Sequence, residues 1–133
     1  MTNSPNGQPL YRLTALGALL LAAGIALGAF GAHGLKEAAT ERYIAVFETG
    51  VQYQIYTALG IMILSMFGKA LEKPILLILA GMWVFSVSLY FIGVNEILAA
   101  SLKKLGAITP IGGVLMIAGW CWAGIKLLRL SKS

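Results

Sequence analysis

Residues 10–30 read LYRLTALGALLLAAGIALGAF, an apolar stretch whose only charged residue is Arg12. An α-helix needs about 20 residues to cross the hydrocarbon core of a bilayer. Three further apolar runs follow at residues 51–67, 75–94 and 111–128. Because no water is available at that depth, each run has to satisfy its backbone polar groups within a helix. We therefore expect an all-α fold, a four-helix transmembrane bundle.

The composition favours the same class. Of the 133 residues, 59% are hydrophobic and 11% are charged, against about 25% charged in a typical soluble domain. A soluble chain of this length could not bury so much apolar surface, so we expect the lipid bilayer to be its main partner. The net charge of +5 comes from lysines and arginines that flank the apolar runs. No basic cluster alternates with aromatic residues, so nucleic-acid binding is not expected.

The chain divides into a tail and one transmembrane domain. Residues 1–9 are polar and rich in turn-forming residues, and we expect them to be disordered. Residues 10–133 form the single transmembrane domain. Its helices are expected at about 10–33, 45–67, 74–94 and 110–129. Thr109, which precedes Pro110, is the expected N-cap of the last helix.

Two connecting segments have the composition of short interfacial helices. LKEAATERYIAV (35–46) joins the first two runs and is rich in alanine, glutamate and lysine. In NEILAASLKKLG (95–106), Leu98, Leu102 and Leu105 share one helix face. We expect both segments to lie at the membrane surface.

Four crossings place both termini on one side of the membrane. Six basic residues belong to that side: Arg12, Lys69, Lys73, Lys126, Arg129 and Lys132. Four belong to the other: Lys36, Arg42, Lys103 and Lys104. Lysine and arginine are more frequent in cytoplasmic segments, so we expect cytoplasmic termini.

Glycine and alanine form seams along the helices. Small residues let helix backbones approach closely in lipid. The glycines expected at packing positions are Gly24, Gly28, Gly31, Gly112, Gly113 and Gly119. On the first helix, alanines line the face opposite the glycines, and His33 continues that face. We therefore expect the first helix to lie between two neighbours, with His33 directed at one of them.

Polar residues concentrate at the membrane face opposite the termini. The expected cluster comprises His33, Glu48, Gln52, Tyr53, Tyr56, Ser88, Asn95 and Thr109. Glu48 or Gln52 is the expected partner of His33, while Val51, Ile55, Ala58 and Met62 are expected to face lipid. Unpaired polar groups at membrane depth are costly. The cluster is therefore either a hydrogen-bond network that fixes helix packing or a pocket for a proton, a lipid headgroup or a quinone-like ligand.

The sequence offers few groups for catalysis or metal binding. Cys121 is the only cysteine, which leaves neither a disulfide within the chain nor a metal–thiolate pattern. Ser86 and Ser88 lie on an expected helix without a nucleophile-elbow motif, and there is no carboxylate pair. We expect no enzymatic activity, no cofactor and no metal.

Four motifs carry a family resemblance: GAFGAHGL (28–35), FETGVQYQIYTALGI (47–61), FSVSLY (85–90) and GAITPIGGVLMIAGW (106–120). In this order they resemble the YgdD-like small membrane proteins, a domain of unknown function related to eukaryotic transmembrane protein 256. The resemblance spans about 13–127 and implies a four-helix protein of the bacterial inner membrane, without an established activity. Two positions depart from the family pattern: Thr57 stands where histidine is usual, and Val87 where glycine is usual. The first departure leaves no pair of histidines for a metal site.

Two functions follow from these observations. The first is a non-enzymatic accessory or scaffolding component that packs through its glycine and alanine seams, in a homo-oligomer or a larger membrane complex. The alternative is a small transporter, or a membrane protein that binds a proton, lipid or quinone, using the polar cluster around His33. Against transport, the other half of the bundle lacks charge within the membrane, and no inverted repeat is apparent.

Overall fold

The computed structural model describes residues 7–98 and 104–132, and every regular element in these two ranges is a helix. The four long helices are α1 (Tyr11–Phe30), α2 (Glu41–Ser65), α3 (Glu72–Gly93) and α5 (Leu105–Leu130). Three short elements join them: η2 (Gly31–Leu35), η3 (Lys69–Leu71) and α4 (Asn95–Leu98). The π-helical η2 continues α1, and the 3₁₀-helical η3 leads into α3. The prediction of an all-α chain is confirmed for this part.

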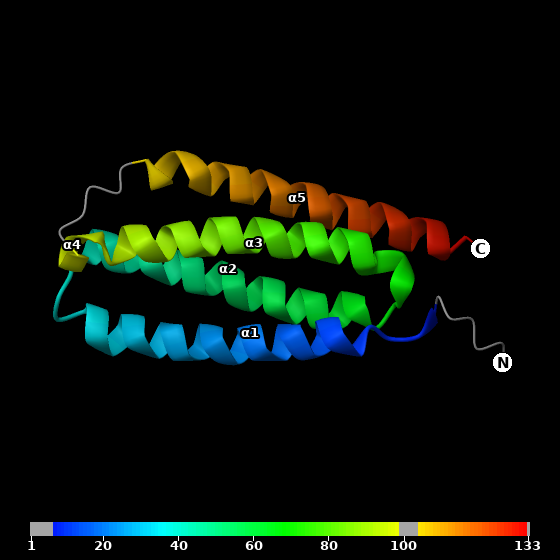
Figure 1. Ribbon diagram of the computed structural model, residues 1–133, viewed down its shortest axis with the longest axis horizontal. Coiled ribbons are helices and arrows are strands. Elements are labelled where there is room, and N and C mark those ends of the chain that lie inside the picture. Colours follow the sequence, from blue (N-terminus) through cyan, green and yellow to red (C-terminus); the bar gives the residue numbers. More distant parts are fainter. Residues whose placement is uncertain (1–6, 99–103, 133) are drawn as a thin grey trace.

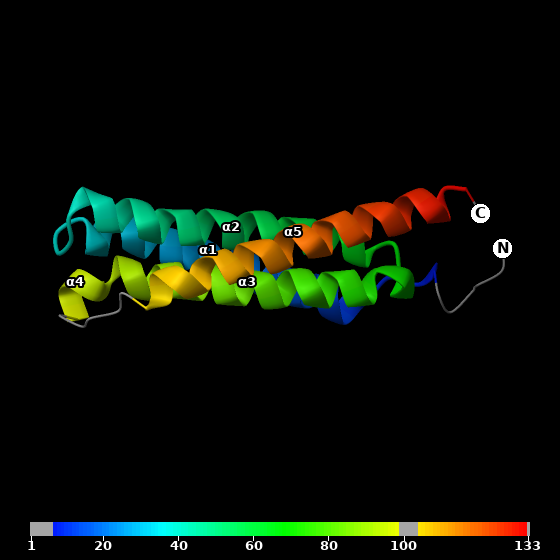
Figure 2. The ribbon, with the colours of Figure 1, turned by 90° about the horizontal axis from the view of Figure 1, so that it is seen from above.

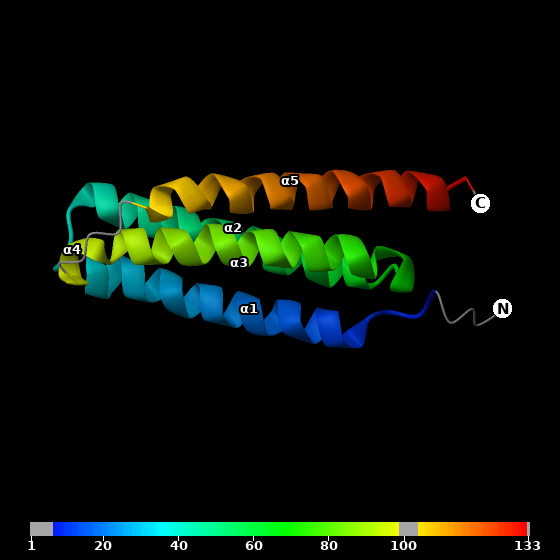
Figure 3. The ribbon, with the colours of Figure 1, turned by 45° about the horizontal axis from the view of Figure 1, so that its top comes forward.

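The four long helices run up and down side by side, so that the chain enters and leaves at the same end (Figure 1). Helices that follow one another in sequence are neighbours in space: α1 packs on α2, α2 on α3, and α3 on α5. The views in Figures 2 and 3 show that α1 and α5 lie on opposite sides of the central pair formed by α2 and α3.

Within residues 7–98 and 104–132, three helical segments are long and apolar enough to cross a membrane: Tyr11–Leu35, Lys69–Gly93 and Leu105–Leu130. The remaining long helix, α2, has 25 residues and a length of about 37 Å. It therefore matches the others in length, but its first half carries glutamate, glutamine and tyrosine side chains that lower its hydropathy. The structure thus supports a membrane protein with three candidate spans.

The start of α2 corrects the expected boundaries. The interfacial helix predicted over residues 35–46 does not form as a separate element, because the residues from Glu41 onward belong to α2. The turn before it is short: Leu35 ends η2, and Thr40 is already extended with φ −72° and ψ 157°. Glu41 in the first turn favours this start, since a carboxylate is stabilised at a helix N-terminus.

The connection from α3 to α5 also differs from the prediction. Of the second interfacial helix, predicted over residues 95–106, the structure shows only α4, which ends at Leu98, and Leu105 already belongs to α5. Residues 99–103, which include Leu102 of the expected leucine face, lie outside the described ranges. The prediction that Thr109 is an N-cap is wrong, because α5 begins at Leu105 and Pro110 lies inside it. Proline is tolerated there because the carbonyl that it leaves unbonded belongs to exposed Gly106.

The N-terminal segment is tied to the helices at its end. The tail predicted to be disordered covers residues 1–9, of which 1–6 lie outside the described part of the chain. The following Leu10 donates its backbone N–H to the Ser65 carbonyl at 2.8 Å.

The apolar core has two parts. The larger one draws on all four long helices, with Leu20, Ile61, Ile78 and Met116 among its buried members. The smaller one consists of Leu35, Ile44, Phe47 and Val51, near the end opposite the termini. Tertiary packing is therefore apolar along most of the length of the helices.

Candidate functional site

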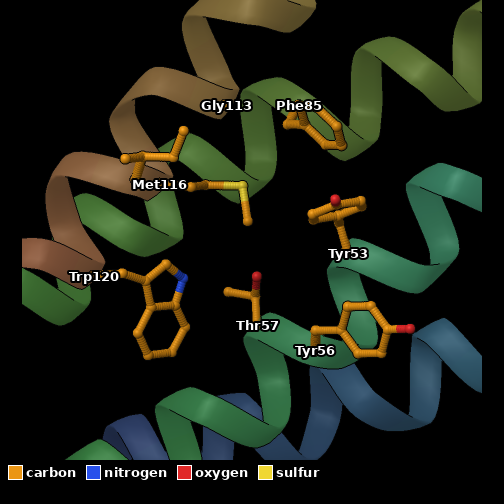
Figure 4. A pocket seen from close by; sticks show the side chains of 8 residues that line it. Tyr53, Tyr56, Thr57, Phe85, Gly113, Met116 and Trp120 are labelled. Carbon is orange, nitrogen blue, oxygen red and sulfur yellow. The ribbon is translucent and has the colours of Figure 1, made fainter.

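A cavity of about 380 Å³ lies between α2, α3 and α5 (Figure 4). Its lining residues are Tyr53, Tyr56, Thr57, Phe85, Gly113, Met116, Ile117 and Trp120. The cavity exists because the backbone of α5 lies close to α3 and farther from α2. Farther along the helices, the Trp120 ring lies against Gly60 of α2 and closes that end of the space.

Thr57 lies deep in this cavity. The residue is only 1% exposed, and its hydroxyl makes no hydrogen bond within residues 7–98 and 104–132. Figure 4 shows the hydroxyl oxygen directed into the cavity, with the indole nitrogen of Trp120 on the cavity side of its ring. The cavity therefore presents hydrogen-bonding capacity that the chain itself does not use.

The side chain of Gln54 in α2 forms hydrogen bonds with both α1 and α3. This side chain, 5% exposed, donates from Nε2 to the Leu20 carbonyl of α1 at 2.8 Å. Its Oε1 accepts a hydrogen bond from the Tyr90 hydroxyl of α3 at 2.6 Å. The predicted cluster did not include Gln54; the available signal is that Gly50, Gln54 and Thr57 share one face of α2.

Further polar contacts join neighbouring helices near the end opposite the termini. The Ser86 hydroxyl donates to the Gly50 carbonyl at 2.9 Å. Ser88 and Thr109, both in the predicted cluster, lie with their hydroxyl oxygens 2.6 Å apart. Asn95, also in that cluster, starts α4, and its Oδ1 is buried without a hydrogen-bond partner in the described structure.

Polar contacts also occur at the end of the bundle where the termini lie. This corrects the expectation that polar residues concentrate at the opposite end. The hydroxyl oxygens of Thr14 and Ser65 lie 2.7 Å apart. Lys126 Nζ donates to the Ala70 carbonyl at 2.9 Å. Both contacts link segments that are far apart in sequence.

The structure does not bring His33 together with its expected partners. His33, Glu48 and Gln52 are all exposed, and no hydrogen bond or ion pair joins them in the described part of the chain. The physical reason is the rotation of α2. The face expected to meet lipid, which includes Val51 and Ala58, is buried instead.

The outer face of α2 therefore carries the polar stripe. Glu48, Gln52 and Tyr56 follow one another at helical spacing and are exposed. Tyr56 and its neighbour Tyr53 form the rim of the cavity, with ring centroids 6.0 Å apart. The alanine face of α1, which His33 continues, is also exposed, so the prediction that neighbours cover both faces of α1 is wrong.

The glycines of α1 face α2. A Cβ atom at Gly24 would lie 2.9 Å from Ile55 Cγ1, and one at Gly31 would lie 3.1 Å from Phe47 Cδ1. At Gly28 the nearest atom is Val51 Cγ1, at 3.3 Å. This seam is therefore occupied by a helix of the same chain.

The glycines of α5 differ from one another. A Cβ at Gly112 would lie 2.5 Å from Phe85 N, and one at Gly119 would lie 2.5 Å from Ile78 Cγ1. At Gly113 the nearest atom, Phe85 Cδ2, is 3.7 Å away, an ordinary contact distance. Gly112 and Gly119 thus set the close packing of α5 on α3, whereas Gly113 lines the cavity.

The described residues contain no group of three or more His, Cys, Asp or Glu side chains that could hold a metal ion. Cys121 is an exposed free thiol. The chemistry that remains is hydrogen bonding and apolar contact, at the cavity and at the outer face of α2.

Comparison with known proteins identifies the family. A family model described as "Protein of unknown function (DUF423)" matches residues 27–113. The chain belongs to the DUF423 family. The resemblance to a small membrane family of unknown function, expected from the four motifs, is thereby confirmed. The matched range includes Thr57 and Phe85 of the cavity.

Bacterial relatives of this DUF423 chain are named as membrane proteins. A UPF0382 membrane protein of Staphylococcus epidermidis is 36% identical over 120 residues, which cover 87% of this chain and 94% of the relative. UPF0382 membrane protein YwdK of Bacillus subtilis is 40% identical over 111 residues, covering 79% and 86%. No solved structure matches the chain. The relatives' names indicate a membrane location and state no activity.

Proposed function

We propose that the chain is a four-span protein of the bacterial cytoplasmic membrane that acts, without catalysis, as a small accessory component of a membrane protein assembly. The observation that carries this proposal is the exposed polar stripe on α2. Gln52 stands at its centre, with Glu48 and Tyr56 one turn away on either side.

The position of α2 supports a fourth crossing. It runs antiparallel between α1 and α3 and packs on both of them. Both neighbours are candidate spans. A helix that lies between two spanning helices along their length has to cross the same hydrocarbon layer.

The depth of Gln52 follows from the hydrogen bond between the Ser86 hydroxyl and the Gly50 carbonyl, which places Gly50 of α2 at the same height as Ser86 of α3. Gly50 lies about 10 Å below the end of α3, and Gln52 lies about 13 Å below it. An exposed primary amide at this depth meets lipid unless another protein covers it. Amide groups buried in an apolar medium without a partner cost about 1–3 kcal/mol by protein mutational data.

A protein partner is therefore the favoured cover for this face. Because the glycine seams of α1 and α5 pack on helices of the same chain, they do not serve as the interface. The partner would present hydroxyl, amide or basic groups to the stripe. A second copy of the chain and a larger complex are distinguished by mass in the experiment below.

The size of the assembly extracted in a gentle detergent tests the proposal. Gln52→Leu removes the amide and is expected to reduce the assembly to the free chain. Ile25→Ala, on the exposed face of α1, is the control and should leave the assembly intact. An unchanged assembly in Gln52→Leu, with the chain folded, would contradict an accessory role that works through α2.

The transporter alternative has less support. It requires a polar path through the bundle, whereas His33, Glu48 and Gln52 lie on its outside. A proton or ion flux in proteoliposomes that His33→Ala abolishes would favour this alternative over the accessory role.

Orientation completes the proposal. We place the termini in the cytoplasm because six of the ten lysines and arginines flank the helices at that end.

A further inference from the structure

The cavity between α2, α3 and α5 lies near the middle of the helices that line it. Thr57 is about 24 Å from the start of α2 and about 12 Å from its end. Phe85 is about 12 Å from the nearer end of α3, and Met116 about 16 Å from the nearer end of α5. In a membrane with a hydrocarbon core of about 30 Å, this position is far from the interfacial region where lipid ester groups lie.

The cavity opens toward the outside of the bundle. Two residues of its rim, Ile117 and Tyr56, are 65% and 57% exposed. The proposed partner would cover the α2 side of this opening, at Tyr56, whereas the α5 side, at Ile117, faces lipid at this depth. A molecule dissolved in the bilayer could therefore enter sideways without passing through water.

The walls of the cavity are aromatic. Tyr53 and Phe85 form one wall, with ring centroids 4.9 Å apart, and Trp120 forms the facing wall (Figure 4). Met116 adds a flexible thioether, which adapts to the shape of a ligand. Aromatic rings favour offset or edge contacts with another ring. A flat ring fits this space better than a flexible acyl chain does.

The cavity offers hydrogen-bond donors and no charge. The hydroxyl of Thr57 and the indole N–H of Trp120 face the space, and neither makes a hydrogen bond within the described structure. The tryptophan nitrogen can only donate. A ligand that satisfies both groups carries acceptor oxygens, such as carbonyls, on an apolar body.

We propose that this cavity binds the ring of a lipid-soluble molecule of the quinone class. The Thr57 hydroxyl donates to a ring carbonyl oxygen, and the ring lies between Trp120 and Phe85. A volume of about 380 Å³ is near the lower end of the range for small-molecule sites. It takes the ring alone, and the isoprenoid chain leaves through the opening into lipid. Ester carbonyls of phospholipids share the acceptor chemistry, so the test has to separate the two sources.

The experiment uses the full chain in nanodiscs made of ether-linked phospholipid, which has no ester carbonyl. Trp83→Phe and Trp122→Phe leave Trp120 as the only tryptophan. Decylubiquinone is added, and quenching of the Trp120 fluorescence is followed. We expect saturable quenching. Thr57→Val, which keeps the shape and removes the hydroxyl, should raise the apparent Kd by about threefold to tenfold, the effect of one hydrogen bond.

Two further variants act as a matched pair on α5. Gly113→Leu places a side chain in the cavity and should abolish the saturable quenching. Gly124→Leu, where a Cβ atom would have no neighbour within 4 Å, should leave it unchanged. Gel filtration and circular dichroism establish that each variant is folded.

Some outcomes would overturn the assignment. Quenching that never saturates would mean that the quinone only partitions into the bilayer. The same conclusion would follow if the quenching in Thr57→Val and in Gly113→Leu were as strong as in the chain without these substitutions. Reversal of the quenching by added diacyl phosphatidylglycerol would assign the cavity to a phospholipid ester instead. A second measurement avoids the tryptophan substitutions: mass spectrometry after gel filtration should find decylubiquinone retained by the native chain and lost from Gly113→Leu.

Discussion

Replacing Gly112 with alanine tests the closest contact between α3 and α5. The added Cβ atom would lie 2.5 Å from Phe85 N and 2.7 Å from the Gly81 carbonyl oxygen. Both are backbone atoms, so no side chain can rotate to relieve the clash. Because non-bonded atoms prefer separations of about 3.5–4.0 Å, α3 and α5 would have to move apart by about 1 Å.

The magnitude follows from two opposing effects. Overpacking in a well-packed interior costs about 1–3 kcal/mol. Alanine in place of glycine returns up to about 1 kcal/mol through helix propensity. We expect Gly112→Ala to lower the free energy of unfolding by about 1–2 kcal/mol, which raises the unfolded fraction by about fivefold to thirtyfold.

The neighbouring glycine provides the control. Gly113→Ala makes the same chemical change one residue along the helix, but its Cβ would meet Phe85 at 3.7 Å. SDS-induced unfolding in mixed micelles, followed by circular dichroism, should show a lower midpoint for Gly112→Ala alone. Equal midpoints for the two variants would refute the argument that helix approach at Gly112 sets the packing of α5.

Three other predictions concern packing and orientation. Gln54→Leu should lower the free energy of unfolding by about 1–3 kcal/mol, because it removes two buried hydrogen bonds; in the same micelle assay, Gln52→Leu should have no such effect. Gly24→Leu should destabilise the free chain, since it meets Ile55, and a change in oligomer size without a change in stability would contradict this. Ser131→Cys, in a Cys121→Ser background, should react with a membrane-impermeant maleimide only after the cells are lysed. Labelling of intact cells would show that the termini lie outside the cytoplasm.

The class of fold could be predicted from the sequence, and so could the close contacts at Gly24, Gly112 and Gly119, but not the place of Gly113 in the cavity wall. Long apolar runs have few structural solutions in lipid, because backbone polar groups must be satisfied within each segment. Gly24 and Gly28 are four residues apart and lie on one helix face, where the absence of side chains lets another helix approach closely. The sequence did not reveal that the partner of this seam is α2 of the same chain.

The rotation of α2 could not be predicted. In water, an apolar face turns inward because burial removes it from solvent, but in lipid an apolar residue such as Val51 gains little by facing another helix. In lipid, an amphipathic pattern therefore no longer indicates which face of a helix packs against the rest of the bundle. What orients α2 is a small number of specific contacts, above all the two hydrogen bonds of Gln54. His33 and Gln52 lie outside as a result.

The cavity could not be predicted either. Its lining residues come from three helices and share no spacing in the sequence. It arises because α5 approaches α3 at Gly112, while Trp120 separates α5 from α2. Such a space depends on the relative position of whole helices, which local patterns do not determine.

Site-specific photocrosslinking in native membranes tests the central claim most directly, namely that another protein covers the polar face of α2. A photoreactive phenylalanine at position 52 should give a crosslinked product whose mass identifies a protein partner, either a second copy or a different chain. The same group at position 25, on the exposed face of α1, should react mainly with lipid. If position 52 also reacts only with lipid, then Gln52 faces the bilayer and the accessory role proposed for α2 is contradicted.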